Sequence, residues 1–182
     1  MGVVVAAVVV VGCGESHNET NEVPLPPTPR ADVTAGCAQR AQPSGFGFEP
    51  GQPGIVAVAG GGATFVVGGA TPDYTGRPDK LKDGAFRFWK TPVELTAGDV
   101  ALVAVAPSDS HHIRLQYSGY EPRFTDFAKA VKFKACANEK TGWPGTIVTP
   151  GGRQCVKLRI WLNDAARPRS LTVGLGRTCP AS

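Results

Sequence analysis

The chain has 182 residues, of which 42% are hydrophobic and 19% are charged, so its composition argues against gross disorder and against a protein with many membrane spans. Its 23 glycines and 16 prolines favour many turns and little long helix. The formal net charge of +4 is uneven, because residues 1–120 hold 8 basic and 11 acidic residues whereas residues 121–182 hold 11 and 4. The basic half favours anionic envelope polymers or lipid head groups over long range, or it forms an ordinary solvated surface. It has no clustered recognition motif, so we expect no nucleic-acid partner.

Export features begin the chain. Residues 3–11 are all valine or alanine, a run too short to cross a bilayer, which takes ~20 apolar residues, but suited to the ~7–15-residue core of an export signal. This run ends in Val10-Val11-Gly12-Cys13, which resembles the lipobox of bacterial lipoproteins, where the cysteine thiol receives diacylglycerol and a peptidase cuts before it. The resemblance implies a signal peptide over residues 1–12 and a lipid anchor at Cys13 on the extracytoplasmic face of the cell membrane. The alternative is a buried valine strand with an ordinary cysteine.

A polar spacer comes next. Residues 14–36 are acidic at first and proline-rich later, with no apolar periodicity, so they cannot order themselves by burying surface. This composition argues against the buried-strand alternative. We therefore expect a disordered, lipid-anchored tether over residues 13–36 and a single domain over residues 37–182.

The sequence of the domain predicts short strands separated by turn residues. Strands at intervals of about ten residues, without helices between them, are typical of an antiparallel sandwich or barrel. We predict an all-β fold, an antiparallel β-sandwich of immunoglobulin-like or jelly-roll-like type, with a tight hairpin at Gly60-Gly61-Gly62. The predicted strands are 55–59, 64–67, 85–89, 100–106, 112–117, 131–135, 145–148, 155–162 and 171–175.

Four cysteines remain once Cys13 is assigned to lipid, and an even number in an oxidising compartment predicts two disulfides. Three pairings are open. We favour Cys136–Cys155, which would join two neighbouring strands, together with Cys37–Cys179, which would fasten both ends of the domain. A zinc site lacks the usual cysteine and histidine spacing.

Basic residues alternate with apolar ones in two of these strands. Lys132 and Lys134 lie on the polar side of one strand, and Lys157 and Arg159 lie on the polar side of the other. The favoured disulfide would set Lys134 opposite Lys157 and Lys132 opposite Arg159. Like charges directly opposite disfavour pairing, so such a ladder would need nearby acids, a bound anion or a partner, unless this register is wrong.

Three tryptophans are the other candidate binding residues. Trp89 and Trp161 share strand parity with charged residues, and Trp143 falls in a predicted loop. Large aromatic rings on a polar side act as platforms for sugar rings or partner peptides. Alternatively, a loop such as 71–84 covers them as additional core.

The sequence provides little sign of catalysis. His111 and His112 are adjacent on a predicted strand, so they point to opposite faces and make a poor metal clamp. Neither a nucleophile elbow nor a phosphate-binding loop is present in the sequence. We expect no metal, no cofactor and no enzymatic activity.

The leading hypothesis is a membrane-anchored extracytoplasmic lipoprotein that binds a cell-envelope component or another exported protein. The alternatives are a glycan- or peptidoglycan-binding module that uses exposed tryptophans, and a secreted hydrolase with a site assembled from distant residues.

Overall fold

The computed structural model describes residues 27–39, 42–52, 54–60, 63–68, 71–72, 79–119 and 121–180, and within them the chain is all-β. The expected signal peptide, Cys13 and the tether as far as residue 26 lie outside the described residues. Helical structure in the described part is limited to two single 3-10 turns, η1 (Cys37–Gln39) and η2 (Phe124–Asp126). Neither turn has the length or the apolar character to span a bilayer.

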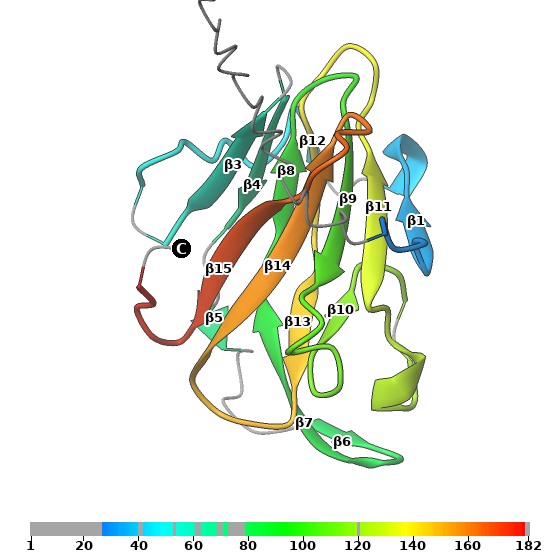
Figure 1. The fold of residues 1–182 in the computed structure, drawn as a ribbon, viewed down its shortest axis with the longest axis vertical. Coiled ribbons are helices and arrows are strands. Elements are labelled where there is room, and N and C mark those ends of the chain that lie inside the picture. Colours follow the sequence, from blue (N-terminus) through cyan, green and yellow to red (C-terminus); the bar gives the residue numbers. More distant parts are fainter. Residues whose placement is uncertain are drawn as a thin grey trace, which may run out of the picture.

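One layer is a five-stranded sheet, visible at the front of Figure 1. Its outermost strand β1 runs parallel to β11, and all its other pairs are antiparallel. Val156, Leu158 and Ile160 point inward and are buried, as the alternation in the sequence predicts. The strands, in spatial order, are β1 (Val33–Ala35), β11 (Ala130–Lys134), β9 (Val100–Val105), β14 (Gln154–Leu162) and β15 (Arg169–Leu175).

Two further sheets contribute the other side of the core. One has the order β10 (Arg114–Gln116), β13 (Thr146–Thr149), β7 (Gly84–Lys90) and β5 (Thr71–Pro72), with β6 (Asp79–Leu81) also paired to β7. The other has the order β2 (Gln42–Pro43), β12 (Thr141–Trp143), β8 (Val93–Leu95), β4 (Ala63–Val67) and β3 (Val56–Gly60). The described strands thus form three mainly antiparallel sheets.

Two prolines mark the division between these two sheets. β7 leads into β8 through Thr91 and Pro92, and β12 leads into β13 through Pro144 and Gly145. The breaks are adjacent, because β12 pairs with β8 on one side of them and β13 pairs with β7 on the other. Proline has no backbone N–H to donate to a sheet, so the ladder is interrupted in both strands at the same level. The Thr91 N–H still donates to the Gly145 carbonyl at 2.9 Å.

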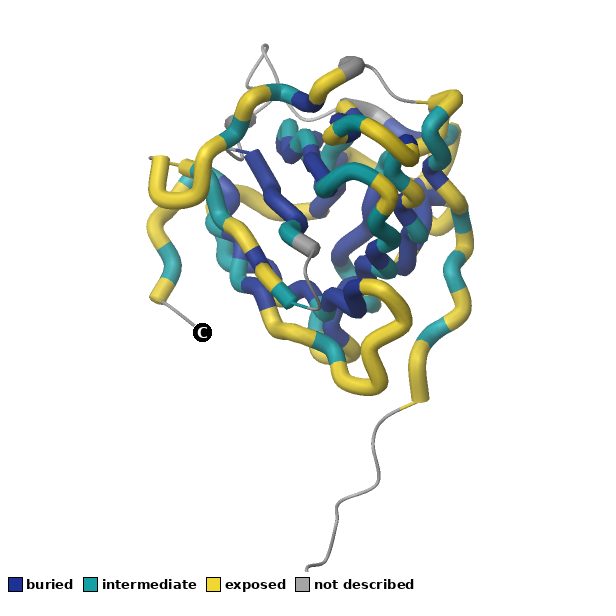
Figure 2. Tube along the Cα trace, turned by 90° about the horizontal axis from the view of Figure 1, so that it is seen from above, coloured by how far each residue is buried: buried dark blue, intermediate teal, exposed yellow. Residues whose placement is uncertain are grey.

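The main core lies between the layers, where Figure 2 shows the buried segments gathered while turns and ends are exposed. It takes side chains from all three sheets, with Phe133 at the centre of contacts to Phe65, Tyr117 and Trp143. A smaller cluster under η2 and β6 comprises Leu81, Phe86, Phe88, Phe124, Phe127 and Val148.

Each strand predicted from the sequence overlaps an observed one, and β3 and β4 form the expected hairpin at Gly60. Strands β1, β2, β5, β6, β8 and β12 were not predicted. β1 lies inside the segment assigned to the tether, so the tether's predicted end at residue 36 is wrong. Asp32 fixes this segment, because its Oδ2 accepts hydrogen bonds from the backbone N–H groups of Lys129 at 2.7 Å and Ala130 at 3.0 Å.

The predicted number of disulfides is confirmed, but the favoured pairing is wrong. Cys37 is bonded to Cys136 and Cys155 to Cys179, with Cα–Cα distances of 4.9 and 5.8 Å. The pairing fails because β11 and β14 are not neighbours: β9 lies between them and pairs with both.

Candidate functional site

The three tryptophans are all buried, with relative exposures of 3% for Trp89, 1% for Trp143 and 4% for Trp161. The Trp89 indole N–H donates to Thr149 Oγ1 at 3.2 Å, and the Trp143 indole N–H donates to the Gly36 carbonyl at 3.1 Å. The hypothesis of exposed tryptophan platforms is therefore wrong: Trp89 and Trp143 belong to the main core, and Trp161 belongs to a small separate cluster.

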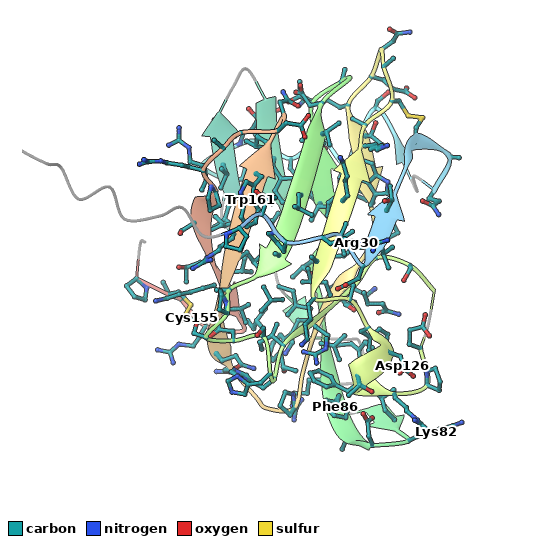
Figure 3. The ribbon with its side chains drawn as sticks, turned by 45° about the vertical axis from the view of Figure 1, so that its right-hand side comes forward. Arg30, Lys82, Phe86, Asp126, Cys155 and Trp161 are labelled. Carbon is teal, nitrogen blue, oxygen red and sulfur yellow. A yellow bond between two sulfur atoms is a disulfide. The ribbon has the colours of Figure 1, made fainter. Side chains whose placement is uncertain are left out.

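Trp161 faces outward from β14 but is covered by residues 27–32, a segment that we call the strap. Figure 3 shows the strap, with Arg30, crossing the front sheet close to Trp161. Pro29 and Trp161 together line two hollows, one on each side of the strap. The cover of Trp161 is thus the proline-rich strap, whereas residues 73–78 of the loop 71–84 lie outside the described residues. The Trp161 indole N–H is buried and has no hydrogen-bond partner among the described residues.

The four predicted basic residues lie on the outer face of the front sheet, but they do not form a ladder of facing charges. Lys132 is paired with Leu102 of β9, and Arg159 is paired with Ala104 of β9. Because β9 separates β11 from β14, Lys134 does not lie opposite Lys157. The predicted register is wrong, whereas the grouping on one polar side is observed.

The histidine pair lies in the turn before β10. His111 is exposed and His112 is partly exposed, and His112 Nδ1 lies 2.9 Å from His111 Nε2. No group of three or more histidine, cysteine, aspartate or glutamate side chains that could hold a metal ion occurs in the part of the chain that the structure describes.

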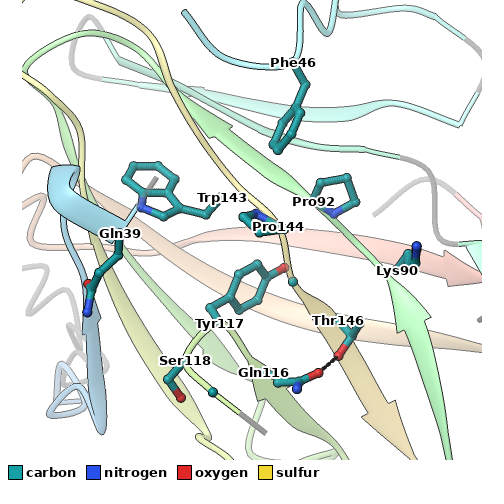
Figure 4. A pocket seen from close by; sticks show the side chains of 12 residues that line it. Gln39, Phe46, Lys90, Pro92, Gln116, Tyr117, Ser118, Trp143, Pro144 and Thr146 are labelled. Atoms are coloured by element: carbon teal, nitrogen blue, oxygen red, sulfur yellow. Dashed lines mark hydrogen bonds between the residues drawn. The ribbon is translucent and has the colours of Figure 1, made fainter. Parts of the chain in front are cut away.

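A cavity of about 630 Å³ opens where the two prolines break the second layer. Figure 4 shows Phe46, Tyr117, Trp143 and the two prolines around it. Its polar lining includes Gln116, whose Oε1 accepts a 2.6 Å hydrogen bond from the Thr146 hydroxyl. The complete lining is Gln39, Phe46, Lys90, Pro92, Gln116, Tyr117, Ser118, Gly119, Trp143, Pro144, Gly145 and Thr146.

Tyr117 forms one wall of the cavity and is fixed from two sides. Its hydroxyl donates to the Thr91 carbonyl at 2.5 Å, and its ring packs edge-on against Phe133 with centroids 5.0 Å apart. The ring also lies over Gly145, in the space that a Cβ at that position would occupy. Burial raises the pKa of Tyr117 far above its ordinary value, and a hydrogen bond with the Thr91 side chain opposes this only in part. The hydroxyl is therefore a neutral donor.

Phe46 forms the facing wall and is positioned by a buried carboxylate. Glu94 on β8 is only 2% exposed, and its Oε2 accepts the backbone N–H groups of Phe46 at 2.6 Å and Gly47 at 3.1 Å. Its Oε1 forms an ion pair with Lys140 Nζ at 3.4 Å. The Phe46 ring in turn lies against Gly142, which has no side chain to displace it.

The lining determines what this cavity can do chemically. Among the described residues that line it, Lys90 is the one charged residue, and the others provide aromatic rings, prolines, amides, hydroxyls and glycines. General acid–base or nucleophilic catalysis needs at least two cooperating groups, such as a carboxylate pair or a nucleophile with its base. Rings and amides instead provide stacking surfaces with a few hydrogen-bonding points, which is the usual composition of a binding pocket.

Two prolines are the sequence feature that indicates this site. Pro92 precedes a strand and Pro144 follows one, and prolines in strand-like segments indicate an interrupted ladder. Phe46 and Tyr117 carry no pattern that predicts their convergence.

Comparison with family models, curated protein sequences and solved structures finds no match to this chain.

Proposed function

We propose that this protein is a lipid-anchored extracytoplasmic binding protein whose β-sandwich head takes a cell-envelope ligand into the aromatic cavity. The observation that carries the proposal is the cavity itself, with two fixed aromatic walls, Phe46 and Tyr117, and a single charged residue among the described part of its lining. Such a lining favours retention of a ligand over its chemical conversion.

The cysteine pairing supports the anchor. The two disulfides use all four cysteines of the head, so Cys13 of the lipobox-like sequence has no partner left in the head. Disulfides persist in oxidising compartments, which agrees with export. A thiol next to an export signal is then available for a lipid, and anchored chains hold a protein at the membrane surface.

Fragments of a cell-wall polymer are the ligand class that we favour. Sugar rings offer flat apolar faces for Phe46 and Tyr117, and their hydroxyls and acetamido groups suit the amides of Gln39 and Gln116. The glycan-binding alternative is thus retained, but its proposed binding site is the cavity and not the exposed tryptophans. The hydrolase alternative receives no support from the lining. A segment of an exported protein is the competing ligand and is an outcome of the test below.

The binding claim is tested by titrating the full chain with solubilised peptidoglycan fragments in a calorimeter. Phe46→Ala removes a wall, and Ser118→Trp places a large ring in the cavity mouth. Ser108→Trp is the matched control, because Ser108 is also an exposed serine and lies in the turn before β10, away from the cavity lining. We expect saturable binding that both cavity variants abolish and that the control retains. Absence of heat with wild-type protein, or unchanged affinity in Ser118→Trp, would refute this ligand and this site.

The anchor claim is tested separately with radiolabelled palmitate in the producing cell. Label should enter the membrane-bound protein and disappear in Cys13→Ser. A labelled Cys13→Ser protein, or wild-type protein that is secreted without lipid, would contradict the anchor and leave the cavity claim intact.

A further inference from the structure

We infer that the outer face of the front sheet is a docking surface for an anionic membrane, and this inference rests on the lipid anchor proposed above. We call this surface the basic face. Its strand positions carry four cations and no acidic residue. The cations are Lys132, Lys134, Lys157 and Arg159.

Two further cations extend the basic face. Arg30 on the strap and Lys129 beside it line one hollow together with Arg159, and Lys132 lines the hollow on the other side of the strap. The hollows measure about 310 and 320 Å³. No ion pair of these six side chains occurs within the part of the chain that the structure describes. Their positive charge is therefore directed to solvent and to whatever approaches this face.

Acidic residues near this face are mostly engaged with the backbone. Asp32 Oδ2 accepts two backbone N–H groups, and Asp109 Oδ2 accepts the Lys157 N–H at 3.0 Å. Asp164 borders the hollow next to Lys132. Six cations against these three carboxylates leave the surface net positive, which attracts anionic phospholipid head groups within a Debye length.

The position at which the tether enters the head favours a membrane as the partner that binds the basic face. The strap begins at Pro27, which lines a hollow of the basic face, and Pro27 stands 14 residues after Cys13 (27 minus 13). Fully extended, those residues reach at most about 50 Å. A lipid at Cys13 therefore keeps the head near the bilayer and pulls on the very face that carries the cations. Soluble anionic polymers share the charge but lack this tethering geometry.

This orientation leaves the aromatic cavity accessible. Tyr117 and Trp143 reach the cavity from the second layer, on the other side of the core from the outer surface of the front sheet. A head lying on the membrane through its basic face would thus hold its ligand site away from the lipid.

The test measures sedimentation with vesicles of a chain that begins at residue 13 and carries Cys13→Ser, so that neither a signal peptide nor a lipid assists. We compare vesicles of phosphatidylglycerol and phosphatidylcholine with vesicles of phosphatidylcholine alone. The face variant combines Lys132→Gln and Lys157→Gln. The control combines Lys82→Gln and Arg123→Gln, which removes the same charge from exposed residues near β6 and η2, away from the strap.

We expect binding to the anionic vesicles only, a loss of about thirtyfold in partition for the face variant, and a much smaller loss for the control. Equal losses in both variants would show attraction by net charge alone and overturn the proposed face. If the wild-type protein does not bind anionic vesicles but does bind soluble teichoic acid, the proposal that the basic face binds a membrane is wrong. Palmitate labelling of Cys13 fails or succeeds independently, so failure of the anchor is distinguished from failure of the face.

Discussion

Pro92 and Pro144 stand at matching breaks in two adjacent strand pairs, and the aromatic cavity opens between them. Each proline removes a donor from the ladder, and the Thr91 N–H to Gly145 carbonyl hydrogen bond is a backbone link that remains across the break. The second layer divides into two sheets at this level, and Tyr117 and Phe46 line the resulting space. The aromatic cavity thus lies where the two prolines interrupt the pairing of the strands.

Gly145→Ala is expected to lower stability by about 1–3 kcal/mol, because a Cβ there would occupy the space of the Tyr117 ring. Urea denaturation measures the loss. Gly152→Ala is the matched control, since nothing lies near a Cβ at that position. Equal small effects of both substitutions would mean that Tyr117 is not held against residue 145.

Tyr117→Phe should change how stability depends on alkaline pH. Burial raises the pKa of Tyr117 in the folded state, whereas tyrosine in the unfolded chain ionises near about pH 10. The stabilisation is therefore complete below about pH 10 and is lost as pH rises toward the folded pKa, by at most ~1.4 kcal/mol per pH unit. Denaturation midpoints measured on either side of pH 10 should fall more steeply for wild type than for Tyr117→Phe. Parallel pH profiles would contradict the raised pKa.

Glu94→Ala should loosen the Phe46 wall, because two backbone N–H groups lose their acceptor. We expect a loss of about 2 kcal/mol or more in the free energy of unfolding, with weaker ligand binding. Lys140→Ala should cost less than about 1 kcal/mol, since the Lys140 side chain is 49% exposed and its ion pair is screened. Urea melts of both variants give the order, and a larger loss for Lys140→Ala would be inconsistent with the role assigned to Glu94.

Removal of the two disulfides should have unequal effects. The bond between Cys37 and Cys136 spans 99 residues and the bond between Cys155 and Cys179 spans 24. Loop-closure entropy predicts stabilisation of about 4.7 and about 3.4 kcal/mol respectively. Paired cysteine-to-serine variants measured by urea denaturation test the order. Non-reducing peptide mapping checks the connectivity, and a peptide joining Cys136 to Cys155 would contradict it.

Asp32→Ala should release the strap from β11. The substitution removes the acceptor of the Lys129 and Ala130 N–H groups, for an expected loss of about 1–3 kcal/mol. Acrylamide should then quench Trp161 more strongly, while Trp89 and Trp143 stay protected in the core. Unchanged quenching would show that Asp32 does not hold the cover of Trp161.

Much of the fold follows from local pattern. Alternation in β14 correctly separates Val156 and Leu158 from Lys157 and Arg159, because a strand with one buried face has period two. The sequence could not reveal that β9 lies between β11 and β14. Strand order depends on long-range packing, and the disulfide pairing inferred without it was wrong.

The site was less predictable than the fold. Strands β8 and β12 were missed because they are three residues long and contain Glu94 and Gly142, which are poor strand signals. Trp161 resembled an exposed platform because parity alone does not show that the strap covers it. The proline-rich composition that predicted a tether also suits a segment that lies extended across a sheet.

The central claim is that the cavity beside Tyr117 binds the ligand, and the indole N–H signals of the protein test it most directly. The three tryptophans give separate proton–nitrogen cross-peaks in an NMR spectrum of the labelled full chain, and Trp143 alone among them lines the cavity. On addition of peptidoglycan fragments, we predict a saturable shift of the Trp143 peak and little change at Trp89 and Trp161. A shift confined to Trp161, or saturable binding that leaves Trp143 unmoved, would contradict the account.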